Sequence, residues 1–234
     1  MPEIALHPEY DWQSFYAAYV RTYIERDVRK LTQVGDDIKF LRFMTAAASM
    51  TGQLLNLASL ARDVNVSPPT AERWLSILVA ANLVFLLQPY HTSVLKRAIK
   101  TPKLYFLDLG LAAYLTKWTS PEVLKTGAVA GAFFESFVVG EIIKSYQNAG
   151  ILDLPLYFYR DRAGVEIDLL IERDGVLHPI EIKKHADPTP SDIRHFAVLD
   201  KLANVKRGSG CVVCMYDKLT TLRGDNRIVP VGWL

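Results

Sequence analysis

The sequence predicts an α/β protein, α+β overall, in which a mainly helical N-terminal domain precedes an α/β domain. Three observations predict this class. Apolar residues recur at helical spacing through most of the first half of the chain. Two short β-branched runs in the second half are separated by Asp174-Gly175, a pair typical of hairpin turns. Between the halves, Thr119-Ser120-Pro121 interrupts the pattern, so we place the boundary between domains 1–118 and 119–234 there.

Length and composition are those of an ordinary globular protein. The chain has 234 residues, of which 50% are hydrophobic and 22% charged, enough for one large or two small domains. A net charge of +2 does not by itself indicate a nucleic-acid partner, so any basic surface must come from local clustering. We find no signal-peptide pattern and no apolar run as long as a membrane span. We therefore expect a cytoplasmic protein without a membrane partner.

The two cysteines, Cys211 and Cys214, stand close together in a Cys-Val-Val-Cys stretch. This spacing fits a redox pair or half of a zinc site. The flanking Val212 and Val213 instead indicate a buried strand, and no second Cys/His pair stands nearby. We therefore interpret both residues as ordinary core cysteines.

The first domain is predicted to consist mainly of helices. We expect helices over 11–30, 36–52 and 55–64. A further helix over 70–82 should follow Ser67-Pro68-Pro69, since serine is a favoured N-cap and proline fits the first helical turn. Its apolar stripe is predicted to contain Ala71, Trp74, Leu75, Leu78 and Val79.

Helix, short turn and helix is the helix-turn-helix pattern. Strands are expected over 83–87 and 103–106, joined by a basic loop over 91–100, and a short helix capped by Asp108 follows. Together these elements predict a winged-helix-like domain.

Two functions compete for that domain. DNA binding would place Arg73 near the major groove and the cations of the loop and the second strand against phosphates. These cations are Lys96, Arg97, Lys100 and Lys103. The helix over 70–82 carries few basic side chains, however, and winged helices also serve as protein-docking modules. DNA contact and protein docking therefore both remain open.

The second domain is predicted to begin with a long amphipathic helix and to continue mainly as strands. The expected elements are a helix over 127–148, a strand over 156–160, a hairpin formed by 164–171 and 179–183, a helix over 188–204, a strand over 211–216 and an edge strand within 227–234.

The hairpin carries three charges in the middle of apolar strands. Side chains alternate along a strand, so Asp168 should share a face with Glu166, away from Ile167, Leu169 and Ile171. Glu181 and Lys183 share a face in the same way. Convergence of Asp168, Glu181 and Lys183 has two interpretations. One is an internal salt bridge. The other is a Mg²⁺ site, in which the Ile182 carbonyl would join the two carboxylates as hard oxygen ligands.

The pattern Asp168…Glu181-Ile182-Lys183 resembles the Asp…(Asp/Glu)-x-Lys core of the PD-(D/E)xK nuclease superfamily. Glu135, in Gly131-Ala-Phe-Phe-Glu-Ser-Phe137, matches the acidic residue on a preceding helix in that superfamily. The resemblance implies a restriction-endonuclease-like fold, with a mixed sheet flanked by helices. It also implies Mg²⁺- or Mn²⁺-dependent phosphodiester hydrolysis. Asp168 and Glu181 would hold metal, Glu135 would be an outer or second-metal ligand, and Lys183 would position water.

Two arginines, Arg160 and Arg162, flank the acidic residues of the hairpin. Their forked donors suit a substrate phosphate. They are equally suited to pair with Asp161 and Glu166, and we expect at least one of them to do so.

The chain as a whole resembles the C-terminal half of prokaryotic AAA-type ATPases that carry a nuclease-like domain of unknown function. The matching stretches are Tyr23-Ile-Glu-Arg-Asp-Val28, Lys100-Thr-Pro-Lys-Leu-Tyr-Phe106, Tyr157-Phe-Tyr-Arg-Asp161 and the hairpin. The resemblance implies an ATPase module as partner, and a second copy of the chain is the other protein partner that we consider. The sequence has no Gly-x-x-x-x-Gly-Lys-Ser/Thr loop, so we expect no ATP hydrolysis by this chain alone. A non-catalytic DNA- or protein-binding regulatory module of an ATPase is the alternative function.

Overall fold

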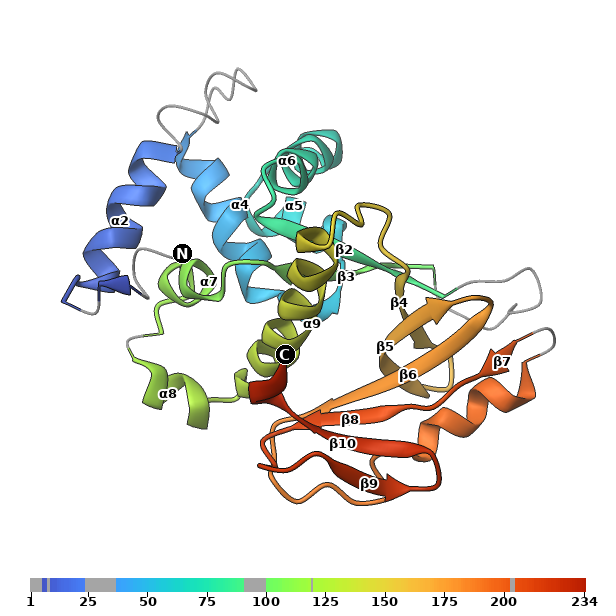
Figure 1. Cartoon of the computed structure of the whole chain (residues 1–234). Helices are drawn as coiled ribbons and strands as arrows, with labels where there is room; N and C mark the ends of the chain where they lie inside the picture. The colour runs from blue at the N-terminus through green and yellow to red at the C-terminus, as the bar shows by residue number, and fades with distance from the viewer. Residues whose placement is uncertain (1–5, 8, 24–36, 91–99, 119, 203–204) are drawn as a thin grey trace. The chain divides into compact units, whose positions relative to one another are not determined.

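The computed structural model describes residues 6–7, 9–23, 37–90, 100–118, 120–202 and 205–234 (Figure 1). It contains helices and a mixed sheet, as the predicted α/β class requires. The chain divides into two compact units. The first unit is Met1–Leu86 with Leu104–Val129, and the second is Leu87–Lys103 with Ala130–Leu234. A stretch that the sequence assigned to the N-terminal domain, 87–103, therefore belongs with the second unit.

The first unit is mainly helical. Its helices are α2 (Trp12–Tyr23), α4 (Asp37–Ser49), α5 (Leu57–Asp63), α6 (Pro68–Ala80), α7 (Leu109–Leu115) and α8 (Pro121–Thr126). The predicted cap of α6 is confirmed, because the Ser67 side chain accepts a hydrogen bond from the Thr70 N–H and prolines occupy the first turn. The predicted cap of α7 is confirmed too, since the Asp108 side chain accepts from the Leu111 N–H.

Aromatic packing organises the core of the first unit. Trp74 of α6 is buried and meets Phe40 and Phe43 of α4 edge-on, with ring centroids 5.4 and 5.6 Å apart. This confirms Trp74 as a core residue. Val79 was predicted to lie in the same stripe, but 36% of its surface is exposed, because α6 buries a narrower face than expected.

The predicted strand pair of the first domain is present. The strands are β2 (Val84–Pro89) and β3 (Lys103–Phe106), and a short β1 (Gln53–Leu54) precedes them. The predicted wing residues Lys96 and Arg97 lie outside the described residues. Lys100 is described and exposed.

The second unit consists of a mixed sheet with helix α9 (Ala130–Asn148) packed on it. Its strands are β4 (Leu156–Arg160), β5 (Glu166–Arg173), β6 (Val176–Lys183), β7 (Lys206–Arg207), β8 (Cys211–Cys214), β9 (Thr220–Arg223) and β10 (Asn226–Pro230). They lie in the order β4-β5-β6-β8-β10-β9, and the last residues of β2 pair with β4. The β4-β5-β6 and β10-β9 pairs are antiparallel, whereas β2-β4, β6-β8 and β8-β10 are parallel.

The predicted hairpin is confirmed as β5 and β6. Asp174 and Gly175 form its turn with φ of 52° and 74°, the positive values that a two-residue type I′ turn requires. Two other elements differ from the prediction. Residues 194–201 form the 3-10 helix η2 (Arg194–Lys201) instead of an α-helix over 188–204. The Asp192 side chain accepts from the Thr189 N–H, a local contact that competes with regular helix.

The edge of the sheet also differs from the prediction. The C-terminal strand β10 lies between β8 and β9, so β9 forms the edge. The sequence of β9, Thr-Thr-Leu-Arg, is mostly polar and exposed, and it carries no alternating apolar signal. A final 3-10 helix, η3 (Val231–Trp233), follows β10.

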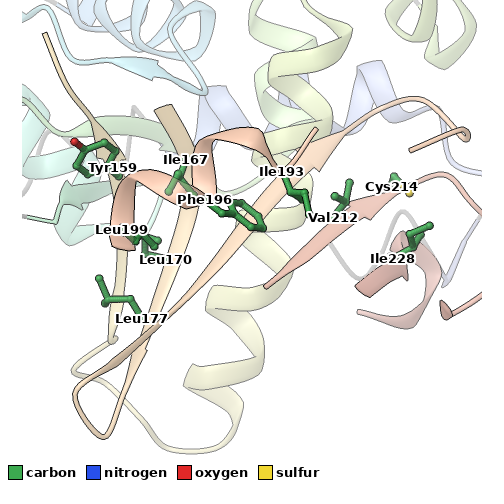
Figure 2. Close-up of a cluster of buried hydrophobic side chains, with 10 residues drawn as sticks. All are labelled: Tyr159, Ile167, Leu170, Leu177, Ile193, Phe196, Leu199, Val212, Cys214 and Ile228. Atoms are coloured by element: carbon green, nitrogen blue, oxygen red, sulfur yellow. The ribbon is translucent and has the colours of Figure 1, made fainter. Parts of the chain in front are cut away.

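One face of the sheet forms a hydrophobic core with η2 (Figure 2). The cluster comprises Tyr159, Ile167, Leu170, Leu177, Ile193, Phe196, Leu199, Val212, Cys214 and Ile228. Ile167 and Leu170 are three residues apart on β5 yet belong to the same cluster, which strict alternation does not allow. The expectation that Ile167, Leu169 and Ile171 share a face is therefore wrong.

The reason is a β-bulge in β5. Tyr157 pairs with Leu170 and Tyr159 with Ile167, so three steps along β5 match two along β4. A bulge bends the strand and re-aims the side chains at the extra residue. Asp168 lies within this irregular segment, which explains why simple alternation could not place its side chain.

Candidate active site

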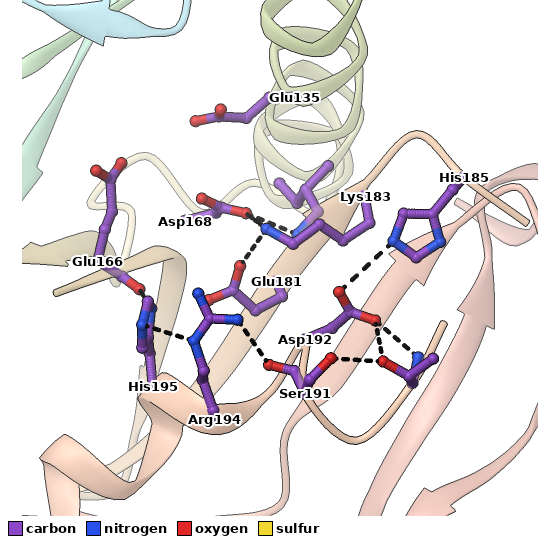
Figure 3. Close-up of polar contacts among 12 residues, drawn as sticks. Glu135, Glu166, Asp168, Glu181, Lys183, His185, Ser191, Asp192, Arg194 and His195 are labelled. Carbon is purple, nitrogen blue, oxygen red and sulfur yellow. Dashed lines mark hydrogen bonds and ion pairs between the residues drawn. The ribbon is translucent and has the colours of Figure 1, made fainter. Parts of the chain in front are cut away.

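Asp168 lies where the two strands of the hairpin separate. The pairing of β5 with β6 extends as far as Leu169 opposite Ile180. Beyond that pair the strands no longer exchange backbone hydrogen bonds. Instead, the Asp168 carboxylate accepts a hydrogen bond from the Ile182 backbone N–H at 2.8 Å (Figure 3). In an antiparallel pair both backbone groups of a residue point toward the same neighbouring strand. The Ile182 carbonyl therefore also faces the Asp168 side of β6.

Glu181 and Lys183 join Asp168 in one cluster. The Lys183 ammonium lies 2.8 Å from Oε2 of Glu181 and 3.7 Å from Oδ2 of Asp168. Burial alone would lower the pKa of Lys183, but the two carboxylates outweigh burial and raise it. The predicted convergence of Asp168, Glu181 and Lys183 is thus present in the structure, although a bulge rather than simple alternation produces it.

Glu181 is almost fully buried, with 3% of its surface exposed. Its Oε1 atom has no hydrogen-bond partner among the described residues. Burial, together with the Asp168 carboxylate, raises the pKa of Glu181 to about 9. Two carboxylates that face each other out of water need a cation or a proton between them. The pair is therefore suited to bind a positively charged group.

Glu135 lies in the first half of α9 and forms an ion pair with Lys103, which was expected to contact DNA. The Lys103 ammonium lies 2.9 Å from Oε1 of Glu135 and also contacts Oε1 of Glu166. Lys103 is only 2% exposed, and its ammonium lies 5.4 Å from the centre of the Phe158 ring. Its assignment to a DNA phosphate is therefore wrong, because the side chain is buried in the second unit.

The sequence contained a signal for this role of Lys103. It begins an otherwise apolar strand, Lys-Leu-Tyr-Phe, and a charge next to a buried strand requires a partner. Burial alone would lower the pKa of Lys103. The carboxylates of Glu135, Glu166 and Asp168 outweigh burial and raise the pKa, so the ammonium stays charged.

Both carboxylate oxygens of Glu166 are engaged. Oε1 contacts Lys103, and Oε2 lies 3.0 Å from a guanidinium nitrogen of Arg160. Of the two roles considered for Arg160, pairing with Glu166 is therefore the one present in the structure. Arg162 is exposed, and the Asp161 side chain accepts from the backbone N–H groups of Ala163 and Val165.

A second polar group lies beside the cluster (Figure 3). His185 contacts Asp192 at 3.5 Å and Asp187 at 3.2 Å, and the field of Asp192 adds to the rise in the pKa of Lys183. On the other side, His195 of η2 contacts the backbone carbonyl of Glu166 at 3.0 Å. These residues support the segment after β6 and the start of β5 around the charged cluster.

The residues present fit one divalent ion better than two. Asp168 and Glu181 offer neighbouring carboxylates, and Oε1 of Glu181 has no partner in the described part of the chain. Glu135 and Glu166 instead hold Lys103. Within the described ranges, no group of three or more His, Cys, Asp or Glu side chains is arranged to hold a metal. The four predicted site residues therefore divide into the cluster of Asp168, Glu181 and Lys183 and a Glu135–Lys103 ion pair.

The predicted nucleic-acid contacts lie on both units. Arg73 is exposed on α6 of the first unit. Lys100 and Arg162 are exposed in the second. In the part of the chain that the structure describes, no helix is long and apolar enough to cross a membrane.

Comparison with protein families agrees with a division into two parts. Residues 1–122, just over half of the chain, match the family described as Domain of unknown function (DUF8612). The chain belongs to this family. Residues 130–234 of this DUF8612 member match a second family, Domain of unknown function (DUF4143). The second match covers α9 and the hairpin, and so contains Glu135, Asp168, Glu181 and Lys183.

Two similar proteins are the uncharacterized proteins Mb2031c of Mycobacterium bovis and Rv2008c of Mycobacterium tuberculosis. Each is 30% identical to this chain over 199 residues, which is 85% of this chain and 44% of the relative. The chain thus spans less than half the length of the curated relatives it matches. No solved structure matches the chain.

Proposed function

We propose that the second unit is a Mg²⁺- or Mn²⁺-dependent phosphodiesterase of the PD-(D/E)xK type that acts on nucleic acid, with DNA as the first substrate to test. The observation that carries the proposal is the buried Oε1 atom of Glu181, which has no hydrogen-bond partner among the described residues. The other oxygen of this carboxylate, Oε2, lies 2.8 Å from the Lys183 ammonium, which is 3.7 Å from Oδ2 of Asp168. A buried carboxylate without a donor is costly unless it takes up a proton or a cation occupies the adjacent space, and we propose that a divalent cation does so in the active protein.

Each residue of this cluster has a distinct role in the proposed reaction. Asp168 and Glu181 hold the ion, and the Ile182 carbonyl faces the same side as the Asp168 carboxylate. When bound, the ion supplies Lewis-acid polarisation of a phosphoryl oxygen and a lowered pKa for water. Lys183, with its side chain one third exposed, orients the attacking water and offsets the negative charge that develops on the phosphate.

The test of this proposal is nuclease activity. Wild type, Glu181→Ala and Lys183→Ala are incubated with MnCl₂ and supercoiled plasmid, single-stranded DNA or RNA. Lys144→Ala, which removes an exposed lysine that pairs with Glu141 on α9, is the matched control. We expect nicking by wild type and control and a loss of at least 100-fold in both site variants, a typical scale for lost general acid–base or electrostatic groups. Equal nicking by all four proteins indicates a contaminating nuclease and overturns the proposal.

A second function has its own supporting observation. The cluster contains four carboxylates and three cations, and most of these groups already pair with one another. Such a network also suits a non-catalytic regulatory module of an ATPase, in which the charges stabilise the fold. Calorimetric titration with MnCl₂ separates the two functions. Binding in wild type that is lost in Asp168→Ala supports the metal site, whereas no binding in either protein supports the regulatory module.

For the first unit we propose a winged-helix-like module that contacts DNA, with Arg73 among its contact residues. The support is the pair α5 and α6 joined by a short capped turn, on which Glu72, Arg73 and Ser76 are exposed on one side of α6. Arg73→Glu should weaken DNA association and flatten its salt dependence, because each phosphate contact releases counterions. Unchanged affinity and salt dependence would favour protein docking instead. By its resemblance to AAA-type ATPases, the proposed docking partner is an ATPase module.

A further inference from the structure

Lys103 is the unexpected member of the acidic cluster. It comes from the start of β3, far in sequence from the hairpin, and its ammonium contacts one oxygen each of Glu135 and Glu166. Those are two of the four carboxylates around the proposed metal site. The other two, Asp168 and Glu181, contact Lys183. The cluster is therefore divided between two ammonium groups.

We propose that the Lys103 ammonium takes the place of a second divalent cation, so that this site binds one metal ion, at Asp168 and Glu181. In this arrangement Lys103 is a positioning residue, because it holds Glu135 and Glu166 away from that ion. This inference rests on the proposed metal-dependent function of the second unit.

The contacts of Lys103 leave it little freedom to move aside. Its side chain is 3% exposed, the Phe158 ring covers it at 5.4 Å, and Phe158 itself is fully buried. Moving the ammonium away would take a charge partner from the partly buried carboxylates of Glu135 and Glu166, which is less favourable than keeping the ion pairs. Lys103 is thus a fixed part of the site rather than a surface lysine that bends inward.

The carboxylate oxygens that are left to bind a metal also indicate a single ion. Both oxygens of Glu166 are used, one by Lys103 and the other by Arg160. Glu135 places Oε1 on Lys103. A divalent ion on these oxygens would lie within a few ångströms of the ammonium, where the repulsion between the two cations is strong. In the part of the cluster formed by Asp168 and Glu181, by contrast, Oε1 of Glu181 has no donor among the described residues. This oxygen is therefore available to a metal ion.

Charge balance supports a single ion as well. Glu135, Glu166, Asp168 and Glu181 contribute four negative charges when ionised. Lys103, Lys183 and Arg160 contribute three positive ones, so one negative charge remains. One divalent ion more than neutralises it. A second would leave a net positive excess of three charges on a partly buried cluster, which is unfavourable.

The test counts bound ions. Wild-type chain, Lys103→Met, and the control Lys144→Met are titrated with MnCl₂, and free Mn²⁺ is followed by electron paramagnetic resonance. Methionine matches the length of the lysine stem without its charge, and circular dichroism verifies folding. We expect one bound Mn²⁺ in wild type and control. We expect two in Lys103→Met, with the broadened spectrum of a coupled ion pair. Two ions in wild type, or one ion in folded Lys103→Met, overturns the inference and leaves the proposed function standing.

A second variant tests the inference without depending on the folding of Lys103→Met. If Glu135 is not a ligand of the single ion, Glu135→Gln should change the affinity for Mn²⁺ by less than threefold. A loss of tenfold or more would make Glu135 a direct ligand and overturn the inference. If wild type binds no Mn²⁺ at all, the proposed function fails and this inference fails with it. Stoichiometry and affinity together thus tell the two failures apart.

Discussion

The Asp168 carboxylate accepts a hydrogen bond from the Ile182 backbone N–H at 2.8 Å, at the point where the β5-β6 ladder ends. The contact fixes the direction of the carboxylate and, at the same time, satisfies a backbone donor that has lost its strand partner. Asp168 therefore has a structural role that does not depend on metal. A substitution that separates this role from the charge is informative.

Asp168→Asn makes that separation, because the amide keeps an oxygen acceptor for the Ile182 N–H but removes the charge. We expect Asp168→Asn to fold with a melting temperature near that of wild type and to bind Mn²⁺ at least tenfold more weakly, about 1.4 kcal/mol. Asp168→Ala should lose both the affinity and about 1–3 kcal/mol of stability, since the N–H is left unpaired. Calorimetry and thermal unfolding measure the two effects. Wild-type affinity in both variants would exclude Asp168 as a ligand.

The raised pKa of Glu181 predicts that the stability of the metal-free protein depends on pH. Its pKa is raised from 4.5 to about 9 in the folded state by burial and the Asp168 carboxylate. A group with a raised folded-state pKa gives stability that is fully present below the unfolded value and is lost as the pH rises through the folded value. The stability that wild type derives from Glu181 should therefore fall between about pH 5 and pH 9.

Glu181→Gln removes this titration. In buffer with EDTA we expect the variant to unfold near the wild-type temperature at pH 5 and to be about 1–3 kcal/mol more stable than wild type at pH 8.5, a typical cost of a buried unpaired polar group. Glu141→Gln, at a helix position that pairs with Lys144, is the control and should show no such trend. A difference between Glu181→Gln and wild type that does not change with pH would contradict the prediction.

The sequence was sufficient to predict the hairpin, because its turn depends on local chemistry. Asp174 and Gly175 adopt the positive φ values that an aspartate-glycine pair tolerates, and the flanking β-branched runs pair as expected. The N-cap of α6 likewise depends on residues close in sequence, because Ser67 accepts its hydrogen bond from Thr70. Such features involve residues a few positions apart, so spacing and residue type decide them.

The parts of the site that the sequence did not predict depend on contacts between distant segments. Lys103 contacts Glu135, which is 32 residues away in sequence. The apolar residues that follow Lys103 indicate that its charge needs a partner, but only the fold identifies Glu135 as that partner. The bulge in β5 is equally hidden, since it appears only in the register with β4. Asp168, Glu181 and Lys183 could be named from their motif, but the division of the four carboxylates between two lysines could not.

Gly175 gives a direct test of the turn that holds the two strands of the hairpin in register. An alanine at φ of 74° is strained, so Gly175→Ala should destabilise the protein by about 1–2 kcal/mol. Gly131→Ala is the matched control, because Gly131 is an exposed residue of α9 with open space around its Cα. There the change should be neutral or stabilising by up to about 1 kcal/mol. Urea unfolding measures both. Equal effects at the two glycines would contradict the turn geometry.

The two thiols test the choice between core cysteines and a redox or zinc pair. Both are free, and positions three apart on the short strand β8 point to opposite faces of the sheet. Burial raises the pKa of both thiols, that of Cys211 to about 12. The thiolate, which is the reactive form, is therefore a very small fraction of Cys211 at pH 8, and a smaller fraction of Cys214 than of an ordinary thiol.

We expect a chromogenic disulfide reagent at pH 8 to label the folded protein at least 100-fold more slowly than the protein unfolded in guanidinium chloride. The thiolate fraction is low at the partly buried Cys211, and burial also limits access to Cys214. Met215→Cys is the matched control. Met215 directly follows β8 and is 52% exposed, so a thiol there should react rapidly in the folded state. Fast labelling of Cys211 and Cys214 in the folded wild type, or zinc released by the reagent, would contradict a core role. Labelling of the Met215→Cys thiol alone would confirm that burial, rather than the reagent, limits the reaction.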